Sequence, residues 1–218
     1  MSKSRLRVAA NAGLKAEVSG MEIPVVFLGG QYNHLIVRAL KELGVSSRMI
    51  MPKVPLKELG GVDGLVMGGG PFSVNDGMER FGNLPEIVEK AEFPVLGICL
   101  SHQLIGKLMG GEVVKGTKPE YGKTVVRVLE EDGILKGVGR EFVAWASHND
   151  EVRRTGRERF EVLAESDCCG VEALRARGRP VFGVQFHVEV ADTPRGMDIL
   201  RNFVGICKVR KEQADNGL

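Results

Sequence analysis

The sequence predicts an α/β fold with a doubly wound, mostly parallel central sheet to which antiparallel strands are added. Three observations support this prediction. In the first half of the chain, short apolar runs of strand length alternate with segments of helical periodicity. In the second half, several β-like runs follow one another with only turns between them. Near the C-terminal end the helical period returns, with one apolar face.

The first half supplies the parallel part of the sheet. The expected strands are Ile23–Leu28, Ser46–Met51, Gly64–Met67 and Pro94–Ile98. The expected helices are one that begins at Asn33 as N-cap and ends at Gly44, one over Pro85–Ala91, and one that follows Ile98 and ends at Gly110–Gly111. Open sheets of this kind bind ligands at the carboxyl ends of their strands, so we expect a site in the loops there.

The second half extends the sheet with antiparallel strands. The expected strands are Thr124–Leu129, Phe142–Ala146, Phe160–Ala164, Val171–Ala176 and Val181–Phe186. A last helix is expected to start at Asp192-Thr193-Pro194, with a cap followed by proline in its first turn. Its apolar face consists of Ile199, Leu200, Phe203, Val204 and Cys207.

We expect one domain over residues 21–208, which suits a chain of 218 residues. Residues 1–20 are basic and alanine-rich without a clear period. We interpret them as a disordered extension or a start-site artefact, because Met21 lies just before the first strand-like run. Residues 209–218 are a charged tail that we expect to fray.

The composition excludes several classes of protein. A net charge of +2, without basic runs interleaved with aromatic residues, gives no argument for a nucleic-acid partner. No apolar run reaches the length that spans a membrane. The four cysteines show no paired C-x-x-C spacing, which argues against a zinc site. We expect no metal and no cofactor in this chain. The sequence lacks a secretory apolar region, and we therefore expect a reduced, cytoplasmic setting.

The stretch PVLGICLSHQLIGKLMGG, residues 94–111, predicts a strand that turns directly into a helix, with Cys99 at the turn. Gly97 and Ser101 lie two residues to either side and leave room for a sharp bend. This is the arrangement of a nucleophile elbow, with cysteine in place of serine. The sulfur would then lie near the positive end of the helix, which favours the thiolate. The alternative is a buried cysteine that packs as a small hydrophobic residue.

A cysteine nucleophile needs a base and a group that orients this base. His102 lies on the helix after Cys99 and is expected to point away from a substrate. His187 ends the last strand-like run, and Glu189 projects to the same side of an extended chain. A carboxylate placed there can fix the imidazole tautomer and stabilise the imidazolium. The alternatives are a satisfied core or surface histidine and a surface ion pair.

Oxyanion donors are expected from two backbone N–H groups. One belongs to Leu100, the residue after the cysteine, and the other to Gly70 in the glycine run 68–70 at a neighbouring strand end. Glycine matters there because the backbone must approach a substrate without a Cβ atom in the way. The alternatives for this run are a tight turn and a phosphate cradle, but no Lys-Ser/Thr pair follows it.

Three motifs in this order resemble the class I, or triad-type, glutamine amidotransferases. GICLSHQLIG resembles that family's nucleophile motif, GVQFHVEV its histidine and glutamate motif, and MGGGPFS its oxyanion loop. The resemblance covers about residues 22–208 and implies a flavodoxin-like fold and glutamine hydrolysis. It implies Cys99 as nucleophile, His187 as base and acid, Glu189 as orienting carboxylate, Gly70 and Leu100 as oxyanion donors, and Gln103, Ser147 and His148 as substrate contacts.

Three positions depart from the family pattern. Ser101 replaces the usual glycine two residues after the cysteine, and Gly68 stands where serine is frequent. Val188 replaces the usual proline between His187 and Glu189, which removes a fixed φ angle. We expect these departures to affect catalytic efficiency more than the type of reaction, because no reacting group is missing.

Within the family, GGQYNHLIVRALKELGV and ASHNDEV resemble most the glutaminase branch of two-subunit GMP synthases. This resemblance implies a separate partner, the ATP-pyrophosphatase subunit, which would bind ATP and magnesium, aminate xanthosine monophosphate (XMP) and receive the ammonia. The alternatives are a glutaminase for another pathway, such as the chorismate or histidine branch, a free-standing γ-glutamyl hydrolase, and a non-catalytic docking module of the same fold.

Overall fold

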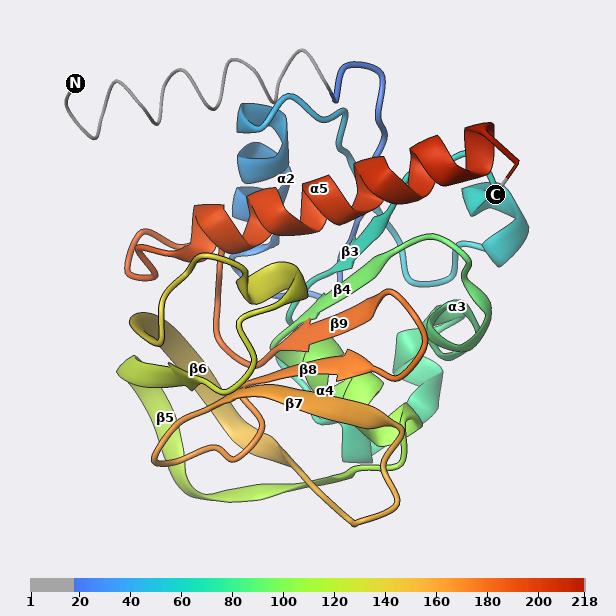
Figure 1. The fold of residues 1–218 in the computed structure, drawn as a ribbon. Coiled ribbons are helices and arrows are strands. Elements are labelled where there is room, and N and C mark those ends of the chain that lie inside the picture. Colours follow the sequence, from blue (N-terminus) through green and yellow to red (C-terminus); the bar gives the residue numbers. More distant parts are fainter. Residues whose placement is uncertain (1–17, 218) are drawn as a thin grey trace, which may run out of the picture.

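The computed structural model describes residues 18–217, so most of the extension expected over residues 1–20 lies outside the described residues. Val18 is already fully buried in the core, and the packed part of the chain therefore includes residues before Met21. Within the described residues, nine strands form one sheet in the order β2-β1-β3-β4-β9-β8-β7-β5-β6 (Figure 1).

The first five strands of this order are parallel and the remaining four are antiparallel. The parallel strands are β2 (Met49–Ile50), β1 (Val25–Val26), β3 (Leu65–Met67), β4 (Val95–Ile98) and β9 (Val181–Val184). The antiparallel strands are β8 (Ala173–Ala176), β7 (Phe160–Glu165), β5 (Glu112–Val128) and β6 (Glu141–Arg153). The parallel part has the flavodoxin-like order, with β9 as its fifth strand. The predicted fold class is confirmed.

Helices cover both faces of the parallel part (Figure 1). The α-helices are α2 (Asn33–Glu42), α3 (Leu84–Lys90), α4 (Leu100–Leu108) and α5 (Gly196–Asp215). The short 3₁₀ helices are η1 (Leu56–Leu59), η2 (Val74–Asp76), η3 (Met78–Phe81) and η4 (Gly133–Leu135). Two core clusters separate the layers, one with α2 and α5 and the other with α3 and α4. Successive strand residues such as Val25 and Val26 enter opposite clusters, which explains why these strands are apolar on both sides.

Three helix ends differ from the sequence prediction. Helix α2 has Tyr32 at its N-cap, and the side chain of Asn33 bonds to another loop instead of capping its own helix. Helix α5 begins at Gly196, because the chain first makes a turn in which Gly196 N–H donates to the Thr193 carbonyl over 2.9 Å. The same helix continues to Asp215, so residues 209–215 of the charged tail are helical.

Strand β5 is much longer than the segment predicted from residue 124 onward. It pairs with β6 from Glu112 to Arg127, with one register shift between Lys115 and Glu120. Gly116 and Pro119 lie inside this shift, where a ladder hydrogen bond is not needed. Residues that look like a turn signal in the sequence therefore mark an irregularity within one strand.

None of the helices formed by residues 18–217 combines the length and the apolar character needed to cross a membrane.

The bend between β4 and α4 requires Gly97. A Cβ atom at this position would lie 2.7 Å from the Ser101 carbonyl oxygen and 2.6 Å from Ile105 Cδ1.

We predict that Gly97→Ala lowers the free energy of unfolding by about 1–3 kcal/mol, the usual effect of overpacking. Gly205→Ala in α5 is the matched control, since a Cβ there meets nothing within 4 Å. It should raise stability by about 0.5–1 kcal/mol through helix propensity. Urea unfolding measures both, and equal effects of the two substitutions would contradict the packing argument.

Candidate active site

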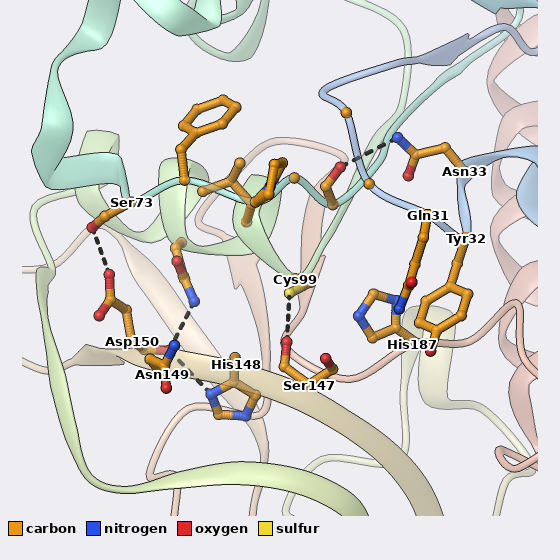
Figure 2. A pocket seen from close by; sticks show the side chains of 18 of the residues that line it. Gln31, Tyr32, Asn33, Ser73, Cys99, Ser147, His148, Asn149, Asp150 and His187 are labelled. Carbon is orange, nitrogen blue, oxygen red and sulfur yellow. Dashed lines mark hydrogen bonds between the residues drawn. The ribbon is translucent and has the colours of Figure 1, made fainter.

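The carboxyl ends of β1, β3, β4 and β9 open into a cavity of about 700 Å³, a volume typical of small-ligand sites. The residues around it come from the loops after these strands and from the β5–β6 ladder (Figure 2). Its lining includes the following residues that the sequence singled out: Gly70, Cys99, Leu100, Gln103, Ser147, His148 and His187. The structure thus brings together residues from both halves of the chain.

Cys99 follows β4 directly and occupies the N-cap position of α4. Its φ angle of 54° is positive, and among residues 18–217 no other non-glycine residue has a positive φ. Such a conformation costs on the order of 1–3 kcal/mol and persists only where the surroundings impose it. Here Cys99 N–H donates to the Val184 carbonyl over 2.8 Å, and the Cys99 carbonyl accepts from Gln103 N–H over 3.1 Å. The sharp bend expected of a nucleophile elbow is present.

His187 lies beside Cys99 and forms a hydrogen bond to Glu189. The distance from His187 Nδ1 to Glu189 Oε1 is 2.7 Å, and the Glu189 side chain is fully buried. Burial lowers the pKa of His187, but hydrogen bonds to Cys99 and to Glu189 outweigh it and raise this pKa to about 10. The arrangement therefore favours an imidazolium that faces the sulfur. It differs from the surface ion pair that was the alternative interpretation of the sequence.

Two contacts that the sequence did not reveal hold the backbone of His187. Its N–H donates to the Trp145 carbonyl over 2.9 Å, and its carbonyl accepts from Thr193 Oγ1 over 2.6 Å. Thr193 Oγ1 in turn accepts from Trp145 N–H over 2.9 Å. The ring of Tyr32 packs edge-on against the His187 ring, with 5.1 Å between centroids. These contacts fix the segment although Val188 stands in place of proline.

The two candidate oxyanion donors lie at this same end of the sheet. Leu100 is the first residue of α4, so its N–H belongs to the group that has no acceptor within the helix. Gly70 follows Gly69, whose Cα lies close to Cys99 and His187. A Cβ atom at Gly69 would be 3.5 Å from Cys99 Cβ and 3.5 Å from His187 Cε1. A side chain at position 69 would therefore occupy the part of the cavity beside Cys99 and His187.

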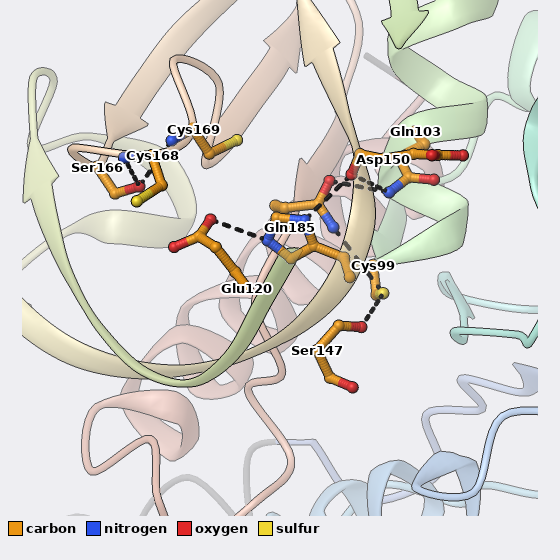
Figure 3. Close-up of polar contacts among 10 residues, drawn as sticks. Cys99, Gln103, Glu120, Ser147, Asp150, Ser166, Cys168, Cys169 and Gln185 are labelled. Atoms are coloured by element: carbon orange, nitrogen blue, oxygen red, sulfur yellow. Dashed lines mark hydrogen bonds and ion pairs between the residues drawn. The ribbon is translucent and has the colours of Figure 1, made fainter. Parts of the chain in front are cut away.

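The residues expected to hold the substrate differ in how free their side chains are (Figure 3). Gln103 donates from Nε2 to the Asp150 carbonyl over 2.7 Å and to Gln185 Oε1 over 3.2 Å. His148 has Nδ1 3.1 Å from the Asp150 carbonyl and Nε2 3.2 Å from Glu120 Oε2.

Each ring nitrogen of His148 thus has a polar neighbour, but only Nδ1 makes a hydrogen bond, and Nε2 lies at ion-pair distance from Glu120. His148 also lines the cavity, so its expected contact with glutamine stays a prediction. The polar contact with His148 lowers the pKa of Glu120, which favours the ionised form of the Glu120 side chain. Ser147 lines the cavity directly, and its carbonyl lies 3.7 Å from Cys99 Sγ.

Three further residues in or behind the site were missed or misinterpreted in the sequence. Asn33 and Thr193 look like helix caps, and only the tertiary structure shows that they bond to other segments. Gln185 precedes His187 by two residues, and its Nε2 lies 3.9 Å from Cys99 Sγ. Its place inside the GVQFHVEV motif was the one available signal. Among residues 18–217 there is no group of three or more His, Cys, Asp or Glu side chains that could hold a metal ion.

Comparisons with known proteins give a consistent result. The model of the family described as Glutamine amidotransferase class-I matches residues 25–207. The glutamine-hydrolyzing GMP synthase subunit of Sulfolobus acidocaldarius is 46% identical over 188 residues, which are 86% of this chain and 100% of that protein. The corresponding GMP synthase subunit of Archaeoglobus fulgidus is 45% identical, with the same coverage.

Solved structures show the same relationship. The crystal structure of a protein assigned to the same GMP synthase subunit, from Thermoplasma acidophilum, superposes with a TM-score of 0.84 at 37% identity, over 89% of this chain and 98% of the other. A glutamine amidotransferase of Thermotoga maritima has a TM-score of 0.66 at 20% identity, over 91% of this chain and 86% of the other, and it supports the fold alone.

The pKa of His187 can be tested without any enzyme assay. We predict that ring NMR signals of labelled histidine show a protonated His187 at pH 7–8, and that Glu189→Gln lowers its pKa, because a hydrogen bond and a charge that favour the imidazolium are lost. The exposed carboxylate of Glu131 provides the control substitution Glu131→Gln, which should leave the titration unchanged. A neutral His187 ring at pH 7 in the wild type would contradict the assignment.

Proposed function

The chain belongs to the class-I glutamine amidotransferases, and from this premise we propose that it is the glutaminase subunit of a two-subunit GMP synthase. In this role it hydrolyses glutamine to glutamate and ammonia. The observation that carries the proposal is the meeting of Cys99 and His187 at one cavity, with the buried Glu189 hydrogen-bonded to His187. The GMP synthase relatives, which align over their whole length, support the choice of pathway.

The proposed first half-reaction forms a thioester. The Cys99 sulfur attacks the carboxamide carbon of glutamine, and the carbonyl electron pair moves onto oxygen. The N–H groups of Gly70 and Leu100 stabilise this oxyanion. His187 then gives its proton to the amide nitrogen, the C–N bond breaks, and ammonia leaves.

The proposed second half-reaction releases glutamate. The departure of ammonia leaves His187 neutral, so it can accept a proton from water. The resulting hydroxide attacks the thioester carbon, and a second oxyanion forms in the same hole. Its collapse breaks the C–S bond and restores the Cys99 thiolate beside a protonated His187. Glu189 accepts the hydrogen bond from His187 Nδ1 and stabilises each imidazolium.

Ammonia is useful to the cell only when an acceptor captures it. We propose that a separate ATP-dependent subunit, which needs magnesium, adenylates XMP and receives the ammonia. The relatives are named as one subunit of a GMP synthase, which supports the presence of a second. We place the reaction in the cytoplasm. This placement rests on the free thiols of Cys99, Cys168, Cys169 and Cys207, which are usual in a reducing compartment.

Reconstitution with the partner subunit tests the nucleophile. We predict that Cys99→Ser abolishes XMP amination with glutamine as nitrogen donor and leaves amination with ammonium salts unchanged, because the ammonia site lies in the other subunit. Cys168→Ser is the matched control, since this cysteine is exposed and does not line the cavity. Loss of both activities in Cys99→Ser would assign a structural role to this residue.

The relative effects of three substitutions test the roles within the site. We predict that Glu189→Ala retains more glutaminase activity than Cys99→Ala or His187→Ala, because an orienting acid contributes less than a reacting group. Losses in kcat of about 10⁴-fold or more are expected for the two reacting groups, and smaller ones for Glu189. Steady-state ammonia release measures all three, and equal losses would count against the assigned roles.

A further inference from the structure

The glycine loop after β3 is held at two successive backbone carbonyls by side chains from other elements. Ser101 on α4 donates from Oγ to the Gly68 carbonyl over 2.6 Å. Asn33 at the start of α2 donates from Nδ2 to the Gly69 carbonyl over 3.2 Å (Figure 2). The Gly30 N–H reaches the same carbonyl over 3.1 Å. Ser101 and Asn33 are 0% and 1% exposed, so neither bond competes with bulk water.

These bonds determine the orientation of the peptide unit between Gly69 and Gly70. In a trans peptide the C=O and the N–H point to opposite sides, and no cis bond occurs among the described residues. Since the Gly69 carbonyl is turned toward Asn33 and Gly30, the Gly70 N–H is turned away from them. Gly69 borders Cys99 and His187 and, with Gly70, lines the cavity.

A run of three glycines does not keep such an orientation without external support. Glycine populates positive and negative φ about equally, so a Gly-Gly peptide can rotate with little steric resistance. The donors that restrain it come from α2 and α4, which pack on opposite faces of the sheet. The loop is therefore fastened to both helical layers.

The same contacts explain two departures from the family pattern. Ser101 and Gly68 lie far apart in the sequence but are hydrogen-bonded partners in the structure. A Cβ atom at position 68 would lie 2.2 Å from Asn33 Oδ1, so the Asn33 carboxamide occupies the space that a side chain at 68 would need. In this chain the hydroxyl group belongs to Ser101 on α4. Position 68 in the loop carries no side chain, which leaves room for the Asn33 carboxamide.

We infer that Asn33 and Ser101 are positioning residues that fix the oxyanion loop with the Gly70 N–H presented to the tetrahedral intermediate. The inference rests on the proposed glutaminase function. Neither side chain touches the reacting atoms, and each acts through a carbonyl of the loop.

The test compares kcat with KM for glutamine hydrolysis by the full chain, alone and with the ATP-dependent partner subunit. Ser101→Ala and Asn33→Ala should each lower kcat by about 10- to 100-fold, less than the 10²–10³-fold loss on removing an oxyanion donor outright. The KM for glutamine should change little, because the oxyanion exists only in the transition state and the intermediates. If Ser101→Ala does not fold, Ser101→Cys keeps the volume with a weak donor, and the same kcat effect is expected.

Two control variants separate positioning from general destabilisation. Ser47 is a buried serine whose Oγ donates to the Ile23 carbonyl over 2.8 Å, far from the loop. Asn202 donates from Nδ2 to the carbonyls of Ile134 and Lys136 over 3.0 and 2.8 Å. Ser47→Ala and Asn202→Ala remove bonds of the same kinds, so they should lower stability to a similar extent while kcat remains that of the wild type.

The outcomes are distinct. A drop in kcat at constant KM, confined to the Asn33 and Ser101 variants, supports the inference. An active wild type with unchanged kcat in both folded variants overturns it and leaves the proposed function intact. Equal kcat losses in the Ser47 and Asn202 controls also overturn it, since the effect would then follow stability. A wild-type chain that hydrolyses no glutamine in either setting would contradict the proposed function itself.

Discussion

The parallel pairing of β4 with β9 is the constraint on which the site depends. Ile98 pairs with Val184, and Cys99 N–H extends the ladder by donating to the Val184 carbonyl. Both strands end at the same edge of the sheet. Cys99, which follows β4, therefore lies beside His187, which comes shortly after β9. The positive φ of Cys99 then turns its helix away from this edge and leaves the sulfur at the cavity. A one-residue slip in this pairing would separate the two groups.

A buried set of polar side chains packs next to the carboxyl ends of β4 and β9. Gln103 links the elbow helix to the Asp150 carbonyl and to Gln185, and His148 links the same carbonyl to Glu120. These bonds cross from α4 to the β5–β6 ladder and to the segment after β9. The two hydrogen bonds of Gln103 favour one arrangement, because breaking either leaves an unpaired group in a medium of low dielectric constant. The antiparallel half of the sheet therefore forms the second wall of the site.

Local chemistry made much of this predictable from sequence. Strand and helix positions follow from apolar periodicity, and the elbow at Cys99 follows from the small residues around it. The remaining features depend on contacts between distant segments. Asn33 and Thr193 have the local signature of a helix cap, yet both bond elsewhere. Nothing in the sequence indicated that Glu120, on the neighbouring strand β5, lies beside the ring of His148.

Covalent labelling with a glutamine-mimicking diazo-ketone, followed by peptide mapping, tests the central claim most directly. Such a reagent needs the glutamine cavity, a reactive sulfur and a nearby proton donor. The account predicts one label per chain, on Cys99, and a much slower reaction when His187 is replaced by Ala. A label on the exposed Cys168 instead, or a rate at Cys99 that does not depend on His187, would contradict it.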